Sequence, residues 1–191
     1  MEDLDLLLAD VRACQACADV LPLGARPVLR LSSTARILIA SQAPGTKVHE
    51  SGIPFCDASG DRLREWMGVS SDEFYDASKV AIVPMGLCYP GRVQDGGDAP
   101  PRPECAPLWR DRLLAHTLEL RLTLLVGVHA QIHALGAGKM VERVMSFREH
   151  LPAVFPLPHP SWRSRHWAAS NPWFDTDVLP ALRQAVQDAL A

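Results

Sequence analysis

The sequence predicts an α/β protein in which helices cover both faces of a parallel sheet. Short apolar runs alternate with segments of helical periodicity, and this alternation is typical of parallel sheets because their strands need helical crossovers. The chain has 191 residues, of which 48% are hydrophobic, so it is long and apolar enough for a sizeable core. We therefore expect one domain that spans residues 1–191.

Four apolar runs of strand length are expected to form the sheet, because such short runs are typical of strands buried on both faces. They cover residues 36–40, 80–83, 122–126 and 153–155. Helical patterns lie around them at residues 4–13, 61–67, 107–118, 130–135, 141–150 and 177–190. In sheets of this kind ligands bind beyond the carboxyl ends of the strands, so chemistry is expected in the segments that follow them.

Composition narrows the classes of protein that the chain can represent. A net charge of −3 gives no overall nucleic-acid signature, although arginine far outnumbers lysine and suits bidentate contacts with phosphate. No apolar run is long enough to span a bilayer, so no membrane partner is expected. The first residues are acidic and lack the order of a signal peptide, so we expect a cytoplasmic protein, acting as a monomer.

Four of the five cysteines have the spacing of a metal or cluster site. Cys14 and Cys17 form a Cys-x-x-Cys pair, and Cys88 and Cys105 follow in mid-chain. Four such thiolates can hold an iron–sulfur cluster or a structural zinc ion, whereas buried free cysteines are the competing interpretation. A redox dithiol is less favoured because the pair follows a helical segment, and disulfides are not expected in a reducing cytoplasm. Cys56 is left over and is expected in a pocket wall or the core.

The segment at residues 41–55 follows the first predicted strand and is the first candidate site. Gly45 and Gly52 permit close approach of a ligand, and Gln42, His49 and Glu50 add polar groups. The next helix has Asp57 or Ser59 as its cap, and its N-terminus would attract an anion. An ordinary long connection is the competing interpretation, but loops of this length are usually functional.

Two further segments follow strands. Residues 84–91 lead into the cysteine-bearing loop, and residues 158–167 follow the last strand. In the latter, His159 stands between two prolines and is followed by basic and aromatic residues with no acid among residues 160–166. This pattern suits a phosphate backbone and stacked bases, although a solvated loop with a packed tryptophan fits equally well. The candidate DNA-binding residues are Trp162, Arg163, Arg165 and His166.

In order along the chain, these segments resemble motifs of the uracil-DNA glycosylase superfamily, most closely its iron–sulfur branch, often called family 4. That branch opens with Cys-x-x-Cys and has Gly-Glu-Ala-Pro-Gly, then Thr-Gly-x-Pro-Phe and a helix that starts with Ala-Gly. Here Ser-Gln-Ala-Pro-Gly stands at residues 41–45, Ser-Gly-Ile-Pro-Phe at 51–55 and Ser-Gly at 59–60. The Cys-x-Pro motif matches residues 88–90, and the closing His-Pro-Ser matches residues 159–161.

The resemblance implies a three-layer α/β/α sandwich with a central four-stranded parallel sheet. It implies a [4Fe-4S] cluster on the four spaced cysteines, with structural zinc as the alternative, and DNA containing damaged bases as the partner. It also implies a monofunctional DNA glycosylase of base excision repair, nucleoid-associated in a prokaryote, that flips a base out and hydrolyses its N-glycosidic bond. His159 would donate a hydrogen bond to the leaving base, Phe55 would stack on that base, and Gln42 would position the water. The base pocket would include Ala43, Pro44, Gly45, Phe55, Met85 and Ser161.

Three positions depart from the superfamily pattern. Gln42 stands where family 4 has glutamate, Ala43 where the best-known branch has aspartate, and Pro84 where family 4 reads uracil with asparagine. Glu50 and Asp57 are nearby carboxylates that could substitute in catalysis. The absent carboxylates also support a second hypothesis, a catalytically weak or silent protein that binds damaged or single-stranded DNA. An unrelated nucleotide-binding protein is less favoured because no Gly-x-Gly-x-x-Gly follows the first strand, and a serine hydrolase lacks its nucleophile motif.

Overall fold

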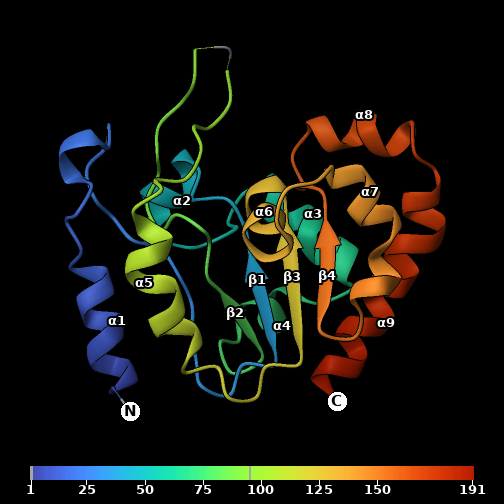
Figure 1. Ribbon diagram of the computed structural model, residues 1–191, viewed down its shortest axis with the longest axis horizontal. Coiled ribbons are helices and arrows are strands. Elements are labelled where there is room, and N and C mark those ends of the chain that lie inside the picture. Colours follow the sequence, from blue (N-terminus) through green and yellow to red (C-terminus); the bar gives the residue numbers. More distant parts are fainter. Residues whose placement is uncertain (1, 95) are drawn as a thin grey trace.

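Four parallel strands form the centre of the molecule, shown in Figure 1 as a computed structural model. It describes residues 2–94 and 96–191, without the side chains of Arg163 and Arg165. The strand order is β2-β1-β3-β4, and every neighbouring pair is parallel. The strands are β1 (Ile37–Ala40), β2 (Val80–Ile82), β3 (Leu122–Val126) and β4 (Val154–Leu157). The predicted parallel sheet of four strands is thereby confirmed.

Helices cover both faces of this sheet and complete the predicted three-layer α/β/α sandwich (Figure 1). Along β1, Ile37 and Ile39 face one layer while Leu38 and Ala40 face the other, because successive side chains of a strand alternate. The first layer contains α3 (Ala58–Met67), α4 (Ser71–Tyr75), α7 (Met140–Met145), the short turns η2 (Phe147–His150) and η3 (Phe174–Val178), and α9 (Leu179–Leu190). The second contains α1 (Leu4–Arg12), α5 (Cys105–Leu114) and α6 (Val128–Leu135).

Several elements differ from the sequence-based expectation for local reasons. The segment at residues 41–55 contains a helix, α2 (Thr46–Ser51), which Gly52 ends with a φ of 72°. A second helix, α8 (Arg163–Ala169), stands where a basic loop was expected. The last strand continues through Pro156 to Leu157. Proline has no backbone N–H, but it is tolerated here because β4 is an edge strand with a neighbour on one side only. The short α4 begins at a capping box of Ser70 and Glu73, a signal that the sequence contains.

Phe55 is held in an uncommon backbone conformation by the start of α3. Its φ is 55°, and its carbonyl oxygen accepts hydrogen bonds from the Tyr75 hydroxyl at 3.0 Å and from Arg64 Nη1 at 3.3 Å. The ring packs edge-on against Phe74, with centroids 6.1 Å apart. Gly60 makes this arrangement possible, because a Cβ atom at that position would lie 1.8 Å from the Phe55 carbonyl oxygen. The backbone at residues 55–60 thus fixes where the Phe55 ring stands.

We expect Gly60→Ala to destabilise the protein strongly and to displace Phe55. Atoms cannot approach to 1.8 Å, so either the first turn of α3 or the Phe55 backbone must move. The expected loss is about 1–3 kcal/mol of unfolding free energy, the usual cost of forcing extra atoms into a packed region, measured by urea denaturation. Gly45→Ala is the matched control, because a Cβ there makes an ordinary contact of 3.5 Å. Equal stability of the two variants would contradict the expectation.

Candidate active site

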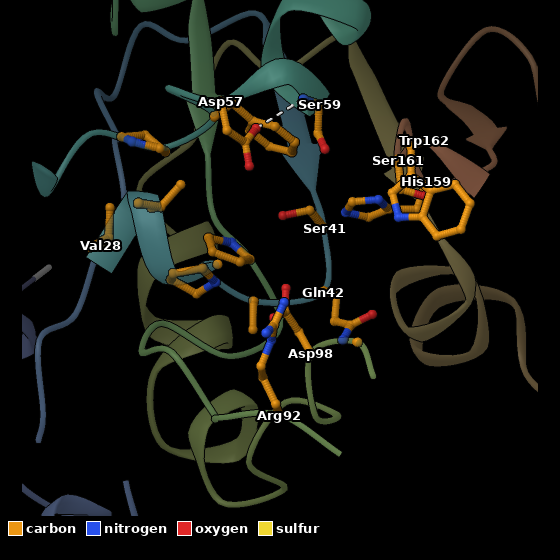
Figure 2. Close-up of a pocket in the computed structure, with 18 of the residues that line it drawn as sticks. Val28, Ser41, Gln42, Asp57, Ser59, Arg92, Asp98, His159, Ser161 and Trp162 are labelled. Atoms are coloured by element: carbon orange, nitrogen blue, oxygen red, sulfur yellow. Dashed lines mark hydrogen bonds between the residues drawn. The ribbon is translucent and has the colours of Figure 1, made fainter. Parts of the chain in front are cut away.

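A cavity of about 650 Å³ opens at the carboxyl ends of the strands. Its wall is formed by the segments that follow β1 and β4, the start of α3, and the loop between β2 and α5 (Figure 2). This is where a parallel α/β sheet usually binds its ligand. Its lining includes Gln42, Phe55, Asp57, Pro84, Arg92, Asp98, His159 and Trp162.

Most of the residues predicted from the sequence line this cavity. They are Gln42, Ala43, Pro44, Gly45, Phe55, Asp57, His159, Ser161 and Trp162. Three others do not belong to the lining. Glu50 is exposed on α2, and its carbonyl oxygen accepts from Arg26 Nη1 at 2.8 Å. Met85 is packed in the core beside Leu125, and His166 is exposed on α8.

His159 stands at the cavity wall shortly after β4, and its environment favours the neutral imidazole. Burial lowers its pKa, while the carboxylates of Asp57 and Asp98 act in the opposite direction. The backbone carbonyl of His159 accepts hydrogen bonds from the Ser161 N–H at 2.8 Å and from the Ser164 hydroxyl. Its Cβ would be only 3.4 Å from a Cβ placed on Gly127. The backbone of His159 is therefore held in place, and the lowered pKa favours the neutral imidazole.

Two further polar residues of the cavity lining, Asp57 and Gln42, form hydrogen bonds with backbone groups. Asp57 caps α3, and its Oδ1 accepts from the N–H groups of Ser59 at 3.0 Å and Gly60 at 3.1 Å. Gln42 donates through Nε2 to the carbonyl oxygen of Ala99 at 3.0 Å. The Gln42 side chain is therefore hydrogen-bonded to the loop between β2 and α5.

That loop brings Arg92 and Asp98 to the cavity, and neither residue is among those predicted from the sequence. They face each other across an isolated antiparallel bridge, and Ala99 N–H donates to the Gly91 carbonyl at 2.8 Å. Partial desolvation raises the pKa of Asp98, although the residue as a whole remains open to solvent; Arg92 and His159 oppose the shift. The glycine pair at residues 96–97 was the available signal, because such pairs favour hairpin turns.

The rim of the cavity carries an exposed aromatic side chain. Trp162 lines the cavity with 66% of its surface exposed. Trp167 instead packs against Trp173 and Phe174, with ring centroids 5.6 and 5.3 Å away, as a structural residue would. Arg62 donates from Nη1 to the Pro160 carbonyl at 3.3 Å, which ties the segment before α8 to α3. The predicted contacts of Arg163 and Arg165 lie outside the described side chains.

A comparison with protein families identifies the chain. The family model described as the Uracil DNA glycosylase superfamily matches residues 30–183. The chain belongs to this superfamily. Its membership supports a DNA glycosylase-like function and a DNA substrate. The match begins after Cys14 and Cys17. In the described part of the chain, no helix combines the length and apolarity that crossing a membrane requires.

The four spaced cysteines of this superfamily member surround a second, small cavity. Cys14 and Cys17 follow α1, Cys88 lies in the loop after β2, and Cys105 begins α5. No group of three or more histidine, cysteine or acidic side chains in the described residues is arranged to hold a metal ion. Cys56 is elsewhere: it is exposed and bonds to the Ser51 hydroxyl at 3.1 Å, so its expected place in the pocket wall or the core is wrong.

Each of the four sulfurs has an N–H donor beside it. Trp109 Nε1 lies 3.3 Å from Cys14, and the Leu87 N–H lies 3.3 Å from Cys105. The Arg26 backbone bonds to Cys88 and the Arg102 side chain to Cys17. Burial, with the neighbouring thiols, raises the pKa of Cys88 to about 11 and also raises that of Cys105. Such donors stabilise sulfur ligands that carry negative charge, so the hydrogen-bonding environment of each cysteine suits a thiolate ligand.

We expect His159 to make stability depend on pH below its ordinary pKa of 6.5. As the pH falls below that value, the unfolded chain takes up a proton that the buried imidazole resists, so stability falls with pH. His159→Gln should therefore be less acid-sensitive than the wild type in urea denaturation from pH 8 to pH 5. His166→Gln, on the exposed side of α8, is the matched histidine control. Parallel curves for wild type and His159→Gln would contradict the expectation.

Proposed function

We propose that this protein is a monofunctional DNA glycosylase that removes uracil or a related deaminated base. The observation that carries the proposal is the cavity at the carboxyl ends of the strands, where Phe55, Gln42 and His159 line a single space. An extruded base entering that space would meet the Phe55 ring as a stacking surface and His159 as a hydrogen-bond donor. Trp162 at the rim is suited to contact the DNA beside the extruded nucleotide.

The chemistry is hydrolysis of the bond between the sugar C1′ and the base nitrogen. The bond breaks with its electron pair leaving on the base, and a water oxygen bonds to C1′ while its proton is released. Negative charge develops on the departing base, so a fixed donor at the base oxygen lowers the barrier. His159 is such a donor as a neutral imidazole, because its position is fixed and burial lowers its pKa.

The base that is preferred depends on which groups of the cavity can read its edge. Pro84 offers no side-chain amide for reading the uracil edge, and Val28 and Ile82 add further apolar surface to the lining. An apolar wall distinguishes bases by shape more than by hydrogen bonds, and shape alone gives weaker discrimination. We therefore propose a broader base range than uracil alone, on single- or double-stranded DNA in the cytoplasm, with the protein acting as a monomer.

A [4Fe-4S] cluster on Cys14, Cys17, Cys88 and Cys105 is the cofactor that we propose. The support is that the four sulfurs line one cavity and that each has an N–H donor. Arg102 adds a positive charge to the cavity wall, and its buried Nε has no partner among the described residues. The cluster would join α1 to α5 and the intervening loop, and it supplies structural rather than chemical function in this scheme.

A DNA-damage binding protein without catalysis is the second candidate. One observation favours it: Gln42 replaces the family 4 carboxylate, and its amide is bonded to the Ala99 carbonyl. Such a protein would use the same cavity to hold an extruded base without breaking its bond. The excision experiment separates the two candidates, because only the glycosylase produces abasic sites.

We expect His159→Ala to reduce base excision at least about a hundredfold, the usual effect of losing one well-placed donor to a developing anion. The measurement is single-turnover formation of abasic sites in oligonucleotides that carry uracil or other deaminated bases. Binding to an oligonucleotide with a stable abasic analogue should change little. His133→Ala, exposed on α6 and outside the cavity, is the matched control. If wild-type protein forms no abasic sites on any base while still binding the damaged DNA, the binding-protein candidate replaces the enzyme.

We expect the purified protein to be brown, with broad visible absorption and about four iron atoms per chain by elemental analysis. Replacement of any one of the four cavity cysteines by alanine should remove the colour. Cys56→Ser should retain it, because Cys56 is exposed and lies outside the cavity. If the protein is colourless and contains stoichiometric zinc, the cofactor is structural zinc and the cluster proposal is wrong.

A further inference from the structure

The cavity contains a carboxylate that no superfamily motif in this chain supplies. Asp98 lines the cavity from the loop between β2 and α5, and its Oδ2 would lie 3.5 Å from a Cβ placed on Gly45. Gly45 belongs to the motif that follows β1, so the carboxylate approaches the backbone of that motif closely. Figure 2 shows Asp98 and Asp57 approaching from different sides, with Ser41 and His159 between them.

We propose that Asp98 is the catalytic carboxylate of this protein, accepting the proton of the attacking water in place of the carboxylate absent at Gln42. The inference rests on the proposed glycosylase function. It assigns the missing group to a hairpin far along the chain from the motif where the superfamily places it.

Gln42 links the position of the absent carboxylate to the hairpin that carries Asp98. Its Nε2 donates to the carbonyl oxygen of Ala99, the residue that follows Asp98, at 3.0 Å. The Ala99 N–H in turn donates to Gly91 at 2.8 Å, which closes the base of the hairpin. The side chain at the usual carboxylate position therefore holds the backbone beside the substitute carboxylate. Gln42 acts as a positioning residue in this scheme, and Asp98 acts on the water.

The other two candidate carboxylates fit this role less well. Asp57 uses Oδ1 to accept two backbone N–H groups at the start of α3, so that oxygen is committed to the helix cap. Glu50 is exposed on α2 and does not line the cavity. Asp98 lines the cavity, and its raised pKa makes it a better proton acceptor than an ordinary aspartate once it is ionised.

The proton balance of the step is complete with groups that the reaction supplies. The water oxygen bonds to C1′, the bond from C1′ to the base nitrogen breaks, and the electron pair leaves with the base. The water proton passes to the Asp98 carboxylate, which then releases it to solvent or to the departing base anion. The carboxylate also stabilises the positive character that develops on the sugar before the water bonds.

Asp98 should give excision an acidic limb, because only the ionised carboxylate accepts a proton. The titratable groups that act on it are Arg92 across the hairpin, Asp57 at the start of α3 and, in its protonated form, His159 after β4. The rate should rise with pH through a pKa above the ordinary value of 3.8 for aspartate. The same raised pKa means that ionised Asp98 opposes folding at neutral pH, so Asp98→Asn should raise the melting temperature.

The test compares single-turnover excision by Asp98→Asn, Asp98→Glu, Gln42→Ala and the double variant Gln42→Ala/Asp98→Asn. We expect Asp98→Asn to be slower by about a hundredfold or more, the low end of general base effects, and to lose the acidic limb. Asp98→Glu should recover part of the rate. The double variant should be no slower than Asp98→Asn alone, because residues that act as one unit are not additive. Asp188→Asn, exposed on α9, is the matched control.

The outcomes separate this inference from the proposed function. If the wild type excises bases and His159→Ala does not, but Asp98→Asn keeps the wild-type rate and acidic limb, Asp98 is not the catalytic carboxylate. A lower melting temperature for Asp98→Asn, with its slower excision restored at lower temperature, would make Asp98 a structural residue of the hairpin and overturn the inference. If the wild type forms no abasic sites at all, the proposed function fails, and the inference fails with it.

Discussion

The common direction of the four strands is the constraint on which the candidate site depends. Because every strand is parallel to its neighbours, the segments that follow β1, β2 and β4 all emerge at one edge of the sheet. Residues that are far apart in sequence, such as Gln42, Asp98 and His159, therefore line one cavity. Alternate side chains of β1 pack against a helical layer on each face, so both faces of the sheet are covered. The edge at the carboxyl ends of the strands is therefore the place where backbone and polar groups can contact a ligand.

The sequence predicted the sheet well because its strands are apolar runs with clear ends. It predicted less of the segments between them, since local propensity does not determine how a loop is held. Residues 46–51 were expected in a loop but form α2, and the basic segment after His159 forms α8. In both cases flanking glycine or proline suggested a loop, but none of these residues interrupts the helix. Gly45 and Gly52 lie at the two ends of α2, and Pro160 lies before α8.

The candidate site was predictable where motif residues directly follow a strand. Gln42, Phe55 and His159 belong to such motifs, and all three line the cavity. Arg92 and Asp98 were missed because a hairpin from a long loop brings them back to the cavity. The glycine pair at residues 96–97 signals the turn, but not the place to which the loop returns. The same reasoning explains Glu50, which is close to the site in sequence but is turned outward by α2. Distance along the chain was the wrong guide to distance in space for these residues.

The cysteine-bearing loop has an architectural consequence for how this site could change. The two ends of the loop lie close together, because the Leu87 N–H donates to Cys105 Sγ at 3.3 Å. The hairpin that carries Arg92 and Asp98 lies between these two ends. For a loop with fixed ends, doubling the length costs only about 0.6 kcal/mol in closure entropy. Residues in this hairpin can therefore be inserted, deleted or exchanged with little effect on the sheet. Relatives with the same sheet and helices could therefore have different cavity walls if this hairpin alone differs in length or sequence.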